Sequence, residues 1–569
     1  MKGKFWHIIP KSFRSRSVGV AISIFLRAIL NFAGIAALLP ILYLILDSDT
    51  IHSNALLHNI YTSCGFESDY RFIVAVAVAM ILFIILKNLL NILLYRYERD
   101  FTYALYRHLS QKLFIGYFNR GLQYIKSSNS AILSRNVNVV CYTFVTGVLR
   151  PLATIVSECL LLTMIFISIA IYSPVGALLA IAVFIPTAAL YFAIMRYRLD
   201  RFGDRENEAH RHKYRDVIET YRGYADIEIN NAFDHQLKSF NRELDTIVSI
   251  GRKNATISTL PQNLTEIGLA AGLALMLIVG SYMGSGEIKI LFGIFAVAGL
   301  RLLPSIRNIM GAWSSLRYNH YTVEVLNEAE NECGTEEEDN SDERIDFEDK
   351  IDIDNISFRF ADAQSDTLHN LTLSIRKGEK LGINGESGAG KTTLLNILLG
   401  LYRPTAGEIR VDGITLDKSL LRRWQNSIGY VSQSIFLTDS TILQNIAFGC
   451  DDADIDMAQV EEAVKAASLS EFVSSLPKGI NTRIGECGAL LSGGQRQRIG
   501  IARALYKRAD ILFFDEATSS LDNATEQSIN KAIEELSNSN KDLTIVVVAH
   551  RESSLDYCDR IITLEKQNS

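Results

Sequence analysis

The sequence has few of the features that mark disulfide-stabilised or zinc-binding proteins. Its seven cysteines, at positions 64, 141, 159, 333, 450, 487 and 558, are scattered and include no C-x-x-C pair. None has a histidine neighbour at the spacing of metal ligands. This excludes a disulfide framework and a zinc site, and it predicts reduced structural thiols.

Long hydrophobic runs are missing from 320–569 and are concentrated in the first 312 residues. Hydrophobic residues make up 48% of the chain, and its mean hydropathy is +0.14. A helix of about 20 apolar residues crosses the roughly 30 Å hydrocarbon core of a bilayer. A soluble protein with buried core helices is the alternative, but apolar stretches alternating with basic loops favour membrane spans. We predict six spans, at 18–46, 72–94, 151–172, 174–195, 264–283 and 288–312.

Lysine and arginine are absent from 47–70 and from the connection at 173–174, and they are frequent before the first span, in 96–150 and in 196–259. The positive-inside bias therefore predicts cytoplasmic termini and cytoplasmic long loops. A secretory signal is excluded, because the first apolar region is too long and no small-residue cleavage site follows it. Apolar residues recur in the first basic loop, so we expect helices that project beyond the membrane. These residues are Leu105, Leu109, Leu113, Ile115 and Phe118.

The net charge of −6 conceals a strongly acidic stretch at 328–350. Such a composition is typical of a solvated linker. The sequence therefore predicts an α-helical six-span domain at 1–327, this linker, and an α/β domain at 351–569. Apolar runs in the last domain are typical of buried parallel strands. We expect strands at 351–360, 371–375, 380–384, 511–514 and 544–549, a helix at 394–401, and no internal repeat.

A glycine-rich segment follows the strand expected at 380–384 and has the form G-x-x-x-x-G-K-[ST], so we expect the α/β domain to be of the P-loop NTPase type. Glycines let the backbone N–H groups point at the phosphates of a nucleotide. The lysine reaches the same oxygens, and the hydroxyl after it holds Mg²⁺. The expected nucleotide-binding residues here are Gly385, Glu386, Ser387, Gly388, Ala389, Gly390, Lys391, Thr392 and Thr393.

A second polar group follows the apolar strand at 511–514. Asp515 would hold Mg²⁺ together with Thr392 and Gln433, and Glu516 would act as the general base on the attacking water. A lone Asp-Glu pair is more often a helix N-cap, but a buried strand downstream of a phosphate loop favours catalysis. Gln433 and His550 complete the expected catalytic residues, sensing the water and the γ-phosphate.

The pentapeptide Leu491–Gln495, of sequence LSGGQ, restricts the class of nucleotide-hydrolysing proteins further. With the motifs above, residues 351–565 resemble the nucleotide-binding domain of an ATP-binding-cassette (ABC) transporter, and the whole chain resembles an ABC exporter half-transporter. The resemblance implies a homodimer or heterodimer with two composite ATP sites, each pairing one phosphate loop with the partner's signature segment. It adds the nucleotide-binding residues Phe360, as the adenine-stacking aromatic, with Ser492, Gly493, Gly494, Gln495 and Asp522.

The same resemblance implies further exporter features. Residues 482–488 are similar to a loop that signals between the cassette and the membrane helices. Coupling helices are expected within 105–125 and 215–230.

Polar residues inside apolar spans are costly and are typical of substrate paths. Arg301 and Lys87 are the candidate substrate contacts; Glu158 is a weaker one, which could instead pair with a basic group. Residues 301–309 are similar to a stretch in lipid-linked oligosaccharide flippases, and 56–61 could form an amphipathic helix suited to that group. We therefore expect an amphipathic or lipid-linked substrate, with a pyrophosphate headgroup facing Arg301.

Two other functions remain open. One is export of another lipid, a drug or a peptide by the same machine. The other is an ATP-gated channel or regulator, which would predict a damaged composite site, whereas Glu516 and the signature are intact. Nucleic-acid partners are not expected, because six spans exclude the soluble cassette ATPases of DNA repair. The predicted location is a bacterial-type inner membrane, with ATP and Mg²⁺ bound on the cytoplasmic side.

Overall fold

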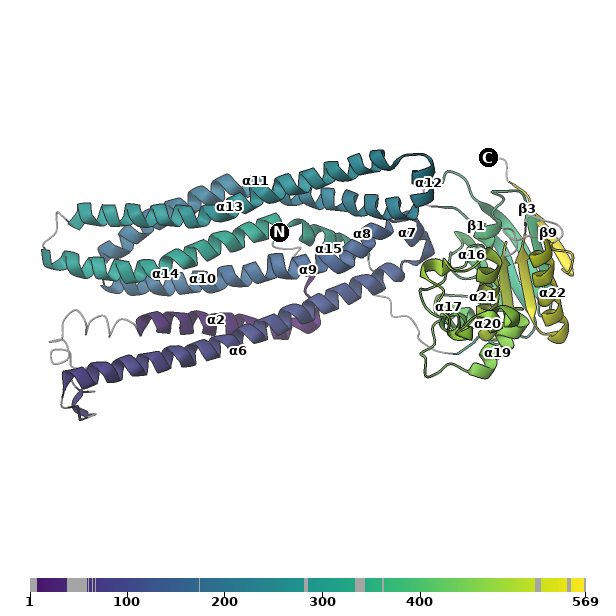
Figure 1. The fold of residues 1–569 in the computed structure, drawn as a ribbon, viewed down its shortest axis with the longest axis horizontal. Helices are drawn as coiled ribbons and strands as arrows, with labels where there is room; N and C mark the ends of the chain where they lie inside the picture. Colours follow the sequence, from purple (N-terminus) through teal and green to yellow (C-terminus); the bar gives the residue numbers. More distant parts are fainter. Residues whose placement is uncertain are drawn as a thin grey trace. The chain divides into compact units, whose positions relative to one another are not determined.

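The computed structural model describes 8–37, 59, 61–63, 65–66, 68–172, 174–280, 285–332, 343–360, 363–516, 523–549 and 554–566. The chain divides into two compact units (Figure 1). One comprises Met1–Arg120 and Tyr124–Thr335, and the other comprises Gly121–Gln123 and Glu336–Ser569. The predicted limits of the membrane domain, linker and cassette stay predictions.

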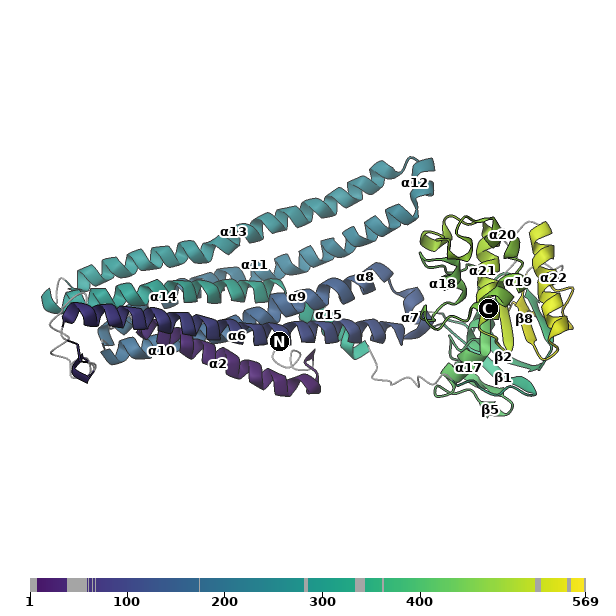
Figure 2. The ribbon, with the colours of Figure 1, turned by 60° about the horizontal axis from the view of Figure 1, so that its bottom comes forward.

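The first unit consists of long helices that run side by side (Figures 1 and 2). In it, α11 packs against α13 and α14, α10 packs against α14 and α2, and α2 packs against α6. At 1.5 Å per residue, a 50-residue helix is about 75 Å long, more than twice the thickness of the hydrocarbon core. As predicted, the helices therefore continue well past their apolar spans. The long helices are α2 (Arg14–Ala36), α6 (Asp69–Phe118), α10 (Arg150–Tyr172), α11 (Pro174–Arg222), α13 (Phe233–Gly280) and α14 (Ser285–Tyr318).

Shorter elements connect these helices. Two single π-helical turns, η2 and η3, interrupt the helical segment before α10. The second ends directly before Arg150-Pro151, where proline removes a backbone donor and cannot continue a regular α-helical ladder. The connecting elements are η1 (Lys11–Phe13), α7 (Gly121–Ser127), α8 (Ser130–Arg135), η2 (Asn136–Val140), α9 (Cys141–Phe144), η3 (Val145–Leu149), α12 (Tyr224–Ile229) and α15 (Tyr321–Glu332).

Within the described part of the chain, four helices are long and apolar enough to cross a membrane: Lys11–Ala36, Asp69–Phe118, Ser130–Ile171 and Ile181–Arg222. They overlap the first four predicted spans, and residues 38–46 of the first span are outside the described residues. The fifth and sixth predicted spans lie on α13 and α14, whose side chains at 279–301 are also outside it. The helix predicted at 56–61 is likewise not described over most of its length.

Near its C-terminal end, α6 buries a narrower face than the apolar pattern of the sequence predicted. Leu105, Leu109 and Leu113 are buried against η2, α9, η3 and α15. Ile115 and Phe118, expected to share that face, are 48% and 71% exposed. Residues 105, 109 and 113 are spaced by four and share a helical face, whereas 115 and 118 have rotated away from it.

A polar seam joins α2 to α6. Arg27 forms an ion pair with Glu98 at 2.8 Å, and both side chains are largely buried. One helical turn further into the span, Asn91 Nδ2 donates to Asn31 Oδ1 at 3.0 Å. A buried charge needs such a partner, so the two helices are held in one register.

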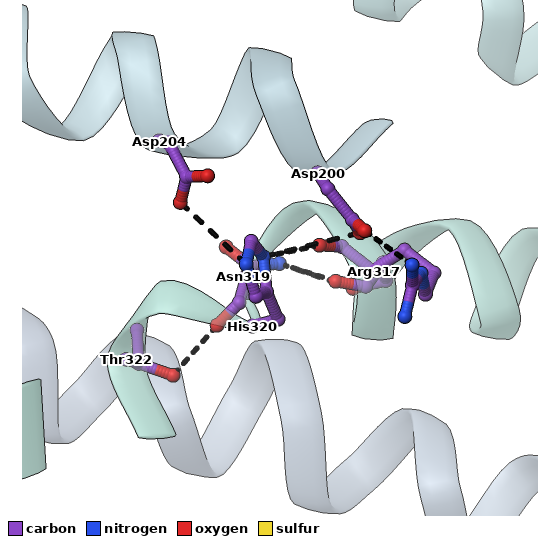
Figure 3. A network of polar contacts seen from close by, with 7 residues as sticks. Asp200, Asp204, Arg317, Asn319, His320 and Thr322 are labelled. Carbon is purple, nitrogen blue, oxygen red and sulfur yellow. Dashed lines mark hydrogen bonds and ion pairs between the residues drawn. The ribbon is translucent and has the colours of Figure 1, made fainter. Parts of the chain in front are cut away.

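The corner between α14 and α15 carries a second polar network (Figure 3). Arg317 forms an ion pair with Asp200 of α11. The ring of His320 lies between Asp200 and Asp204, with Nε2 at 3.6 Å from Asp204 Oδ1. Asn319 donates to the Ser315 carbonyl at 2.8 Å. These contacts fix the end of α14 against α11.

The second unit contains a four-stranded antiparallel sheet, ordered β2-β1-β4-β5, and a five-stranded parallel sheet, ordered β6-β7-β8-β3-β9. Helix α16 and the antiparallel sheet cover one face of the parallel sheet, and α18, α19, α21 and α22 cover the other. Alternate residues of β7 enter the two cores, which explains why its sequence is continuously apolar. The strands are β1 (Lys350–Phe358), β2 (Leu368–Arg376), β3 (Lys380–Gly385), β4 (Ala406–Val411), β5 (Ile414–Thr415), β6 (Ile428–Val431), β7 (Ile511–Asp515), β8 (Thr544–Val548) and β9 (Arg560–Leu564).

The helices of this unit surround the parallel sheet (Figure 2). The predicted helix at 394–401 begins three residues earlier, because the phosphate loop ends directly in a helical turn at Lys391. The helices are α16 (Lys391–Leu398), α17 (Leu421–Ser427), α18 (Ile442–Ile446), α19 (Met457–Ala466), α20 (Ser470–Ser475), η4 (Gly479–Asn481), η5 (Glu486–Gly488), α21 (Gly493–Tyr506) and α22 (Asn523–Ser539).

Candidate nucleotide-binding site

The carboxyl ends of the parallel strands form one edge, and most of the predicted site residues follow these ends. In the register of the sheet, Val431 of β6 lies opposite Phe514 of β7, and Asp515 lies opposite Val548 of β8. Strand β3 ends beside them at Gly385. Ligands of open α/β sheets bind at this edge. The sheet therefore gathers the phosphate loop, Asp515-Glu516 and Gln433, which are far apart in the sequence.

The phosphate loop depends on Gly390, which precedes α16. Its φ of +92° is in the left-handed region, and a Cβ there would come within 2.8 Å of Leu368 Cδ2 and 3.0 Å of the Thr367 carbonyl oxygen. Only glycine adopts this turn without strain. The turn allows α16 to begin at Lys391 with its first N–H groups facing the loop, which is the geometry of an anion site.

Lys391 lies inside the loop. Its ammonium donates to the Gly385 carbonyl at 2.6 Å and to the Glu386 carbonyl at 3.2 Å. Burial lowers the pKa of Lys391, while the nearby carboxylates of Glu516 and Asp515 act in the opposite direction. The structure thus brings Lys391 together with the two carboxylates that were predicted to act beside it.

Asp515 and Glu516 occupy different surroundings at the end of β7. Asp515 is 6% exposed, and the Tyr430 hydroxyl lies 3.5 Å from its Oδ2. Burial and the charge of Asp515 raise the pKa of Tyr430. Glu516 has a φ of +47°, and its N–H donates to the Val548 carbonyl at 2.9 Å. A positive φ is strained for a residue other than glycine, and such strain is typical of functional sites.

Gln433 completes this group. Its Nε2 donates to Glu516 Oε2 at 2.7 Å, and its side chain is exposed. Gln433 and Glu516 were predicted to face the same attacking water, and the structure places their polar atoms in direct contact. Tyr430 was not predicted as a site residue. Its position three residues before Gln433, on the strand that leads to the site, is the only signal for it in the sequence.

Phe360 lies in an aromatic cluster. Its ring packs edge-to-face on Phe358 at 4.9 Å and on Tyr402 at 5.8 Å between centroids. Tyr402 itself stacks on Phe358. Adenine stacking by Phe360 stays a prediction. Tyr402, which braces the ring, comes from a segment without a recognisable motif and was missed.

The signature segment begins α21 with a capping box. Ser492 Oγ accepts from the Gln495 N–H at 3.3 Å, and Gln495 Oε1 accepts from the Ser492 N–H at 2.8 Å. Ser492 and Gly493 are exposed. The serine hydroxyl keeps its own proton to donate, and the first turn of a 14-residue helix favours an anion.

The predicted substrate residues lie in the first unit. The Lys87 side chain lies against α2, where a Cβ at Gly34 would come within 2.8 Å of Lys87 Cδ. The side chain of Arg301 is outside the described residues, as are Asp522 and His550. Glu158 Oε1 accepts from Asn308 Nδ2 at 2.8 Å, so an amide takes the place of the basic partner considered for it.

Comparisons with known proteins show what this chain is similar to. Residues 368–519 match the family model described as "ABC transporter". The chain is 32% identical over 352 residues, 61% of its length, to an "ATP-dependent lipid A-core flippase" of Cupriavidus pinatubonensis. It is 31% identical over 399 residues, 68% of its length, to the protein of the same name from Cupriavidus metallidurans. The matches span 59% and 65% of these two relatives' own lengths.

One solved structure matches nearly the whole chain. This is a bacterial Atm1-family ABC exporter with ATP bound, with a TM-score of 0.76, 21% identity, and coverage of 98% of this chain and 95% of that one. The fold therefore extends the cassette match to the helical unit, whose apolar helices make this a multi-pass membrane protein. Residues 368–519 thus belong to the ABC transporter family, and the chain as a whole has the fold of an ABC exporter half-transporter.

Proposed function

We propose that this chain is one subunit of an ATP-driven exporter that moves a lipid across the membrane. The observation that carries the proposal is the contact between Gln433 Nε2 and Glu516 Oε2 at 2.7 Å, beside the buried Lys391 and Asp515. These groups form the water-activating and phosphate-binding parts of an ATPase at one sheet edge. The family match itself implies a cassette that binds ATP.

The side chains have distinct roles in this proposal. The loop amides and Lys391 hold the β- and γ-phosphates, and Lys391 exchanges its bonds to loop carbonyls for bonds to phosphate. Glu516 accepts a proton from the water that attacks the γ-phosphorus, and Gln433 orients that water. His550 is proposed to donate to a γ-phosphate oxygen. Phe360 offers a ring face on which adenine stacks. This contact contributes to ATP binding and takes no part in hydrolysis.

The site also fits Mg²⁺. Thr392, Gln433 and Asp515 offer a hydroxyl, an amide oxygen and a carboxylate, the hard oxygen donors that Mg²⁺ prefers. Among the described residues, no group of three His, Cys, Asp or Glu could hold a metal by itself. Mg²⁺ commonly takes several of its ligands from substrate phosphates and water. When bound, Mg²⁺ would neutralise charge that develops on the phosphate oxygens.

A second subunit is part of the proposal. The chain carries one phosphate loop and one LSGGQ segment. The exposed N-terminus of α21 offers amides and the Ser492 hydroxyl to an anion outside the chain. We therefore propose a dimer, homomeric or heteromeric, in which Ser492, Gly493 and Gly494 of one subunit close on the nucleotide of the other. Residues such as Asp522 and Gln495 would border the same nucleotide.

The substrate class rests on the relatives. Both flippases compared above are named for lipid A-core. A lipid-linked oligosaccharide is our finer proposal, with Arg301 and Lys87 as headgroup contacts. From the distribution of basic residues we propose that the cassette lies on the cytoplasmic side of an inner membrane. The second candidate substrate is another lipid, a drug or a peptide, since the same ATP-driven transport cycle can export all three.

The test uses the full chain in proteoliposomes. Flipping of a fluorescent polyprenyl-pyrophosphate oligosaccharide is measured by quenching from outside, with fluorescent lipid A-core as a second probe. We expect ATP-dependent flipping of at least one probe. Glu516→Gln should reduce both flipping and ATP turnover at least about 100-fold while ATP still binds. Robust drug transport with neither probe flipped would contradict the lipid proposal, and near-normal turnover by the Glu516→Gln variant would contradict the general base.

A further inference from the structure

Arg503 is a buried cation on the signature helix α21, about three turns after Ser492. Its Nε donates to the Asn445 carbonyl at 2.8 Å, and one terminal nitrogen donates to the Phe436 carbonyl at 2.8 Å. The other lies 3.3 Å from Asn445 Oδ1, and the guanidinium stacks over Phe448 at 4.6 Å. Burial lowers the pKa of Arg503 to about 10, so the side chain remains protonated at neutral pH.

Asn445 accepts two of these hydrogen bonds, and its side chain also bonds to the backbone of Thr438 and Thr441. It is fully buried, and its Oδ1 accepts from the Thr438 N–H at 3.0 Å. Its Nδ2 donates to the carbonyls of Thr438 and Thr441 at 3.1 and 3.0 Å. A buried polar network with all its members bonded is rigid. Segment 436–445 is therefore fixed to α21 through Arg503.

Apolar contacts join the same two parts. Ile435 fits over Gly500 of α21 so closely that a Cβ on Gly500 would lie 2.6 Å from Ile435 Cδ1. Leu437 is buried in the core that α18 and α21 share. Residues 435–437 thus lie directly on the signature helix, by packing as well as by hydrogen bonds.

The segment starts at the nucleotide site. Only Ser434 separates Ile435 from Gln433, and Ser432 Oγ donates to the Ser434 carbonyl at 2.8 Å. Gln433 itself contacts Glu516, which belongs to the β7 side of the site. One short stretch therefore has the catalytic carboxylate at one end and the signature helix at the other.

We propose that Arg503 is a positioning residue that makes Gln433 and the N-terminus of α21 move as one body. This deepens the proposed function and rests on it. A change at Gln433 when the nucleotide binds would then move Ser492 toward the partner's nucleotide. Without the clamp, Gln433 could respond while α21 stayed in place, and ATP would bind without being hydrolysed efficiently.

The guanidinium geometry explains why an arginine is used. Its planar fork reaches three acceptors in fixed directions and stacks on an aromatic ring. A lysine keeps the charge but offers a single point of contact, so it cannot hold both 436 and 445 in register. Arg503→Lys is therefore the conservative variant that separates positioning from charge.

The test measures ATPase kinetics of the full-length protein in nanodiscs for Arg503→Lys, Gln433→Ala and the double variant. Lys391, which is proposed to hold the phosphates, is unchanged in Arg503→Lys, so we expect KM of this variant within about threefold of wild type and kcat at least about tenfold lower. The double variant should be no slower than Gln433→Ala, since both changes break one linkage. Arg498→Lys is the matched control, because Arg498 of the same helix donates to the Ser468 carbonyl, away from this segment.

Gly500→Ala tests the same linkage without touching the arginine, in case Arg503→Lys does not fold. Its Cβ should push Ile435 away and lower kcat, again without adding to Gln433→Ala. The proposal would be contradicted if kcat of a double variant fell by the product of the losses in its two single variants. Near-normal kcat in Arg503→Lys or in Gly500→Ala would also contradict it. Absence of ATP turnover in the wild type would instead contradict the proposed function and remove the basis of this inference with it.

Discussion

At the scale of single residues, the phosphate loop depends on a backbone conformation that one added carbon would disturb. Gly390→Ala should lower ATP affinity at least about tenfold, because its Cβ meets Leu368 and the Thr367 carbonyl. The left-handed φ alone costs roughly 1–2 kcal/mol for an L-residue. Equilibrium binding of a fluorescent ATP analogue to the full-length protein measures the loss.

Gly413→Ala is the control for backbone strain. Gly413 has a φ of +81° with open space around its missing Cβ, in the turn between β4 and β5. The control should therefore lose stability but bind ATP normally. Equal loss of ATP binding in both variants would mean that general destabilisation, rather than the loop geometry, explains the effect of Gly390→Ala.

Single residues differ in how far their sequence context reveals them. Lys391, Glu516 and Gln433 were predictable as neighbours, because each follows shortly after the end of a parallel strand and such ends share one edge of the sheet. Arg503, Asn445 and Tyr402 were not. Their roles depend on contacts between segments that no local pattern relates, such as the bond from Arg503 to the Phe436 carbonyl.

At the scale of elements, hydrophobic pattern predicted the existence of strands and long helices better than their ends. Strand β7 was visible because both its faces are buried. Helix α16 begins at Lys391, earlier than predicted, because loop glycine and threonine residues hide its first turn. The π-turns η2 and η3 change hydrogen bonding without changing the apolar period, so periodicity could not reveal them.

The start of α21 offers a prediction at this scale. Ser492→Ala removes the acceptor of the Gln495 N–H and should cost about 1 kcal/mol of cassette stability. The same change removes the hydroxyl proposed to face the partner's phosphate, so ATP turnover should fall at least about tenfold. Thermal unfolding and ATPase assays on the same preparations measure the two effects.

Asp456→Ala provides the matched control. Asp456 caps α19 by accepting from the Ala458 and Gln459 N–H groups, so its loss should cost about the same stability. It lies outside the proposed site, and turnover should be close to wild type. A similar fall in turnover for both variants would show that helix capping alone, and not the signature hydroxyl, accounts for the effect.

At the scale of the whole molecule, the proposed composite sites would make ATPase activity a property of two chains. Consider a hybrid of one Lys391→Ala subunit and one Ser492→Arg subunit, isolated through two different tags. The first subunit's intact signature segment then faces the second subunit's intact phosphate loop, while both lesions fall in the other site. Two individually inactive variants should therefore give a hybrid with about half of the wild-type ATPase activity, because one of two equivalent sites remains whole.

The arrangement of the same lesions provides the control. When both substitutions are placed on one chain and paired with a wild-type subunit, each site contains one lesion, and the hybrid should be inactive. If each chain instead worked alone, this hybrid would keep the activity of its wild-type subunit, and the first hybrid would have none. Because the two hybrids carry identical numbers of identical substitutions, loss of folding or of dimer formation cannot reproduce the predicted contrast. ATPase rates of the two tandem-purified hybrids thus distinguish a composite site from two independent ones.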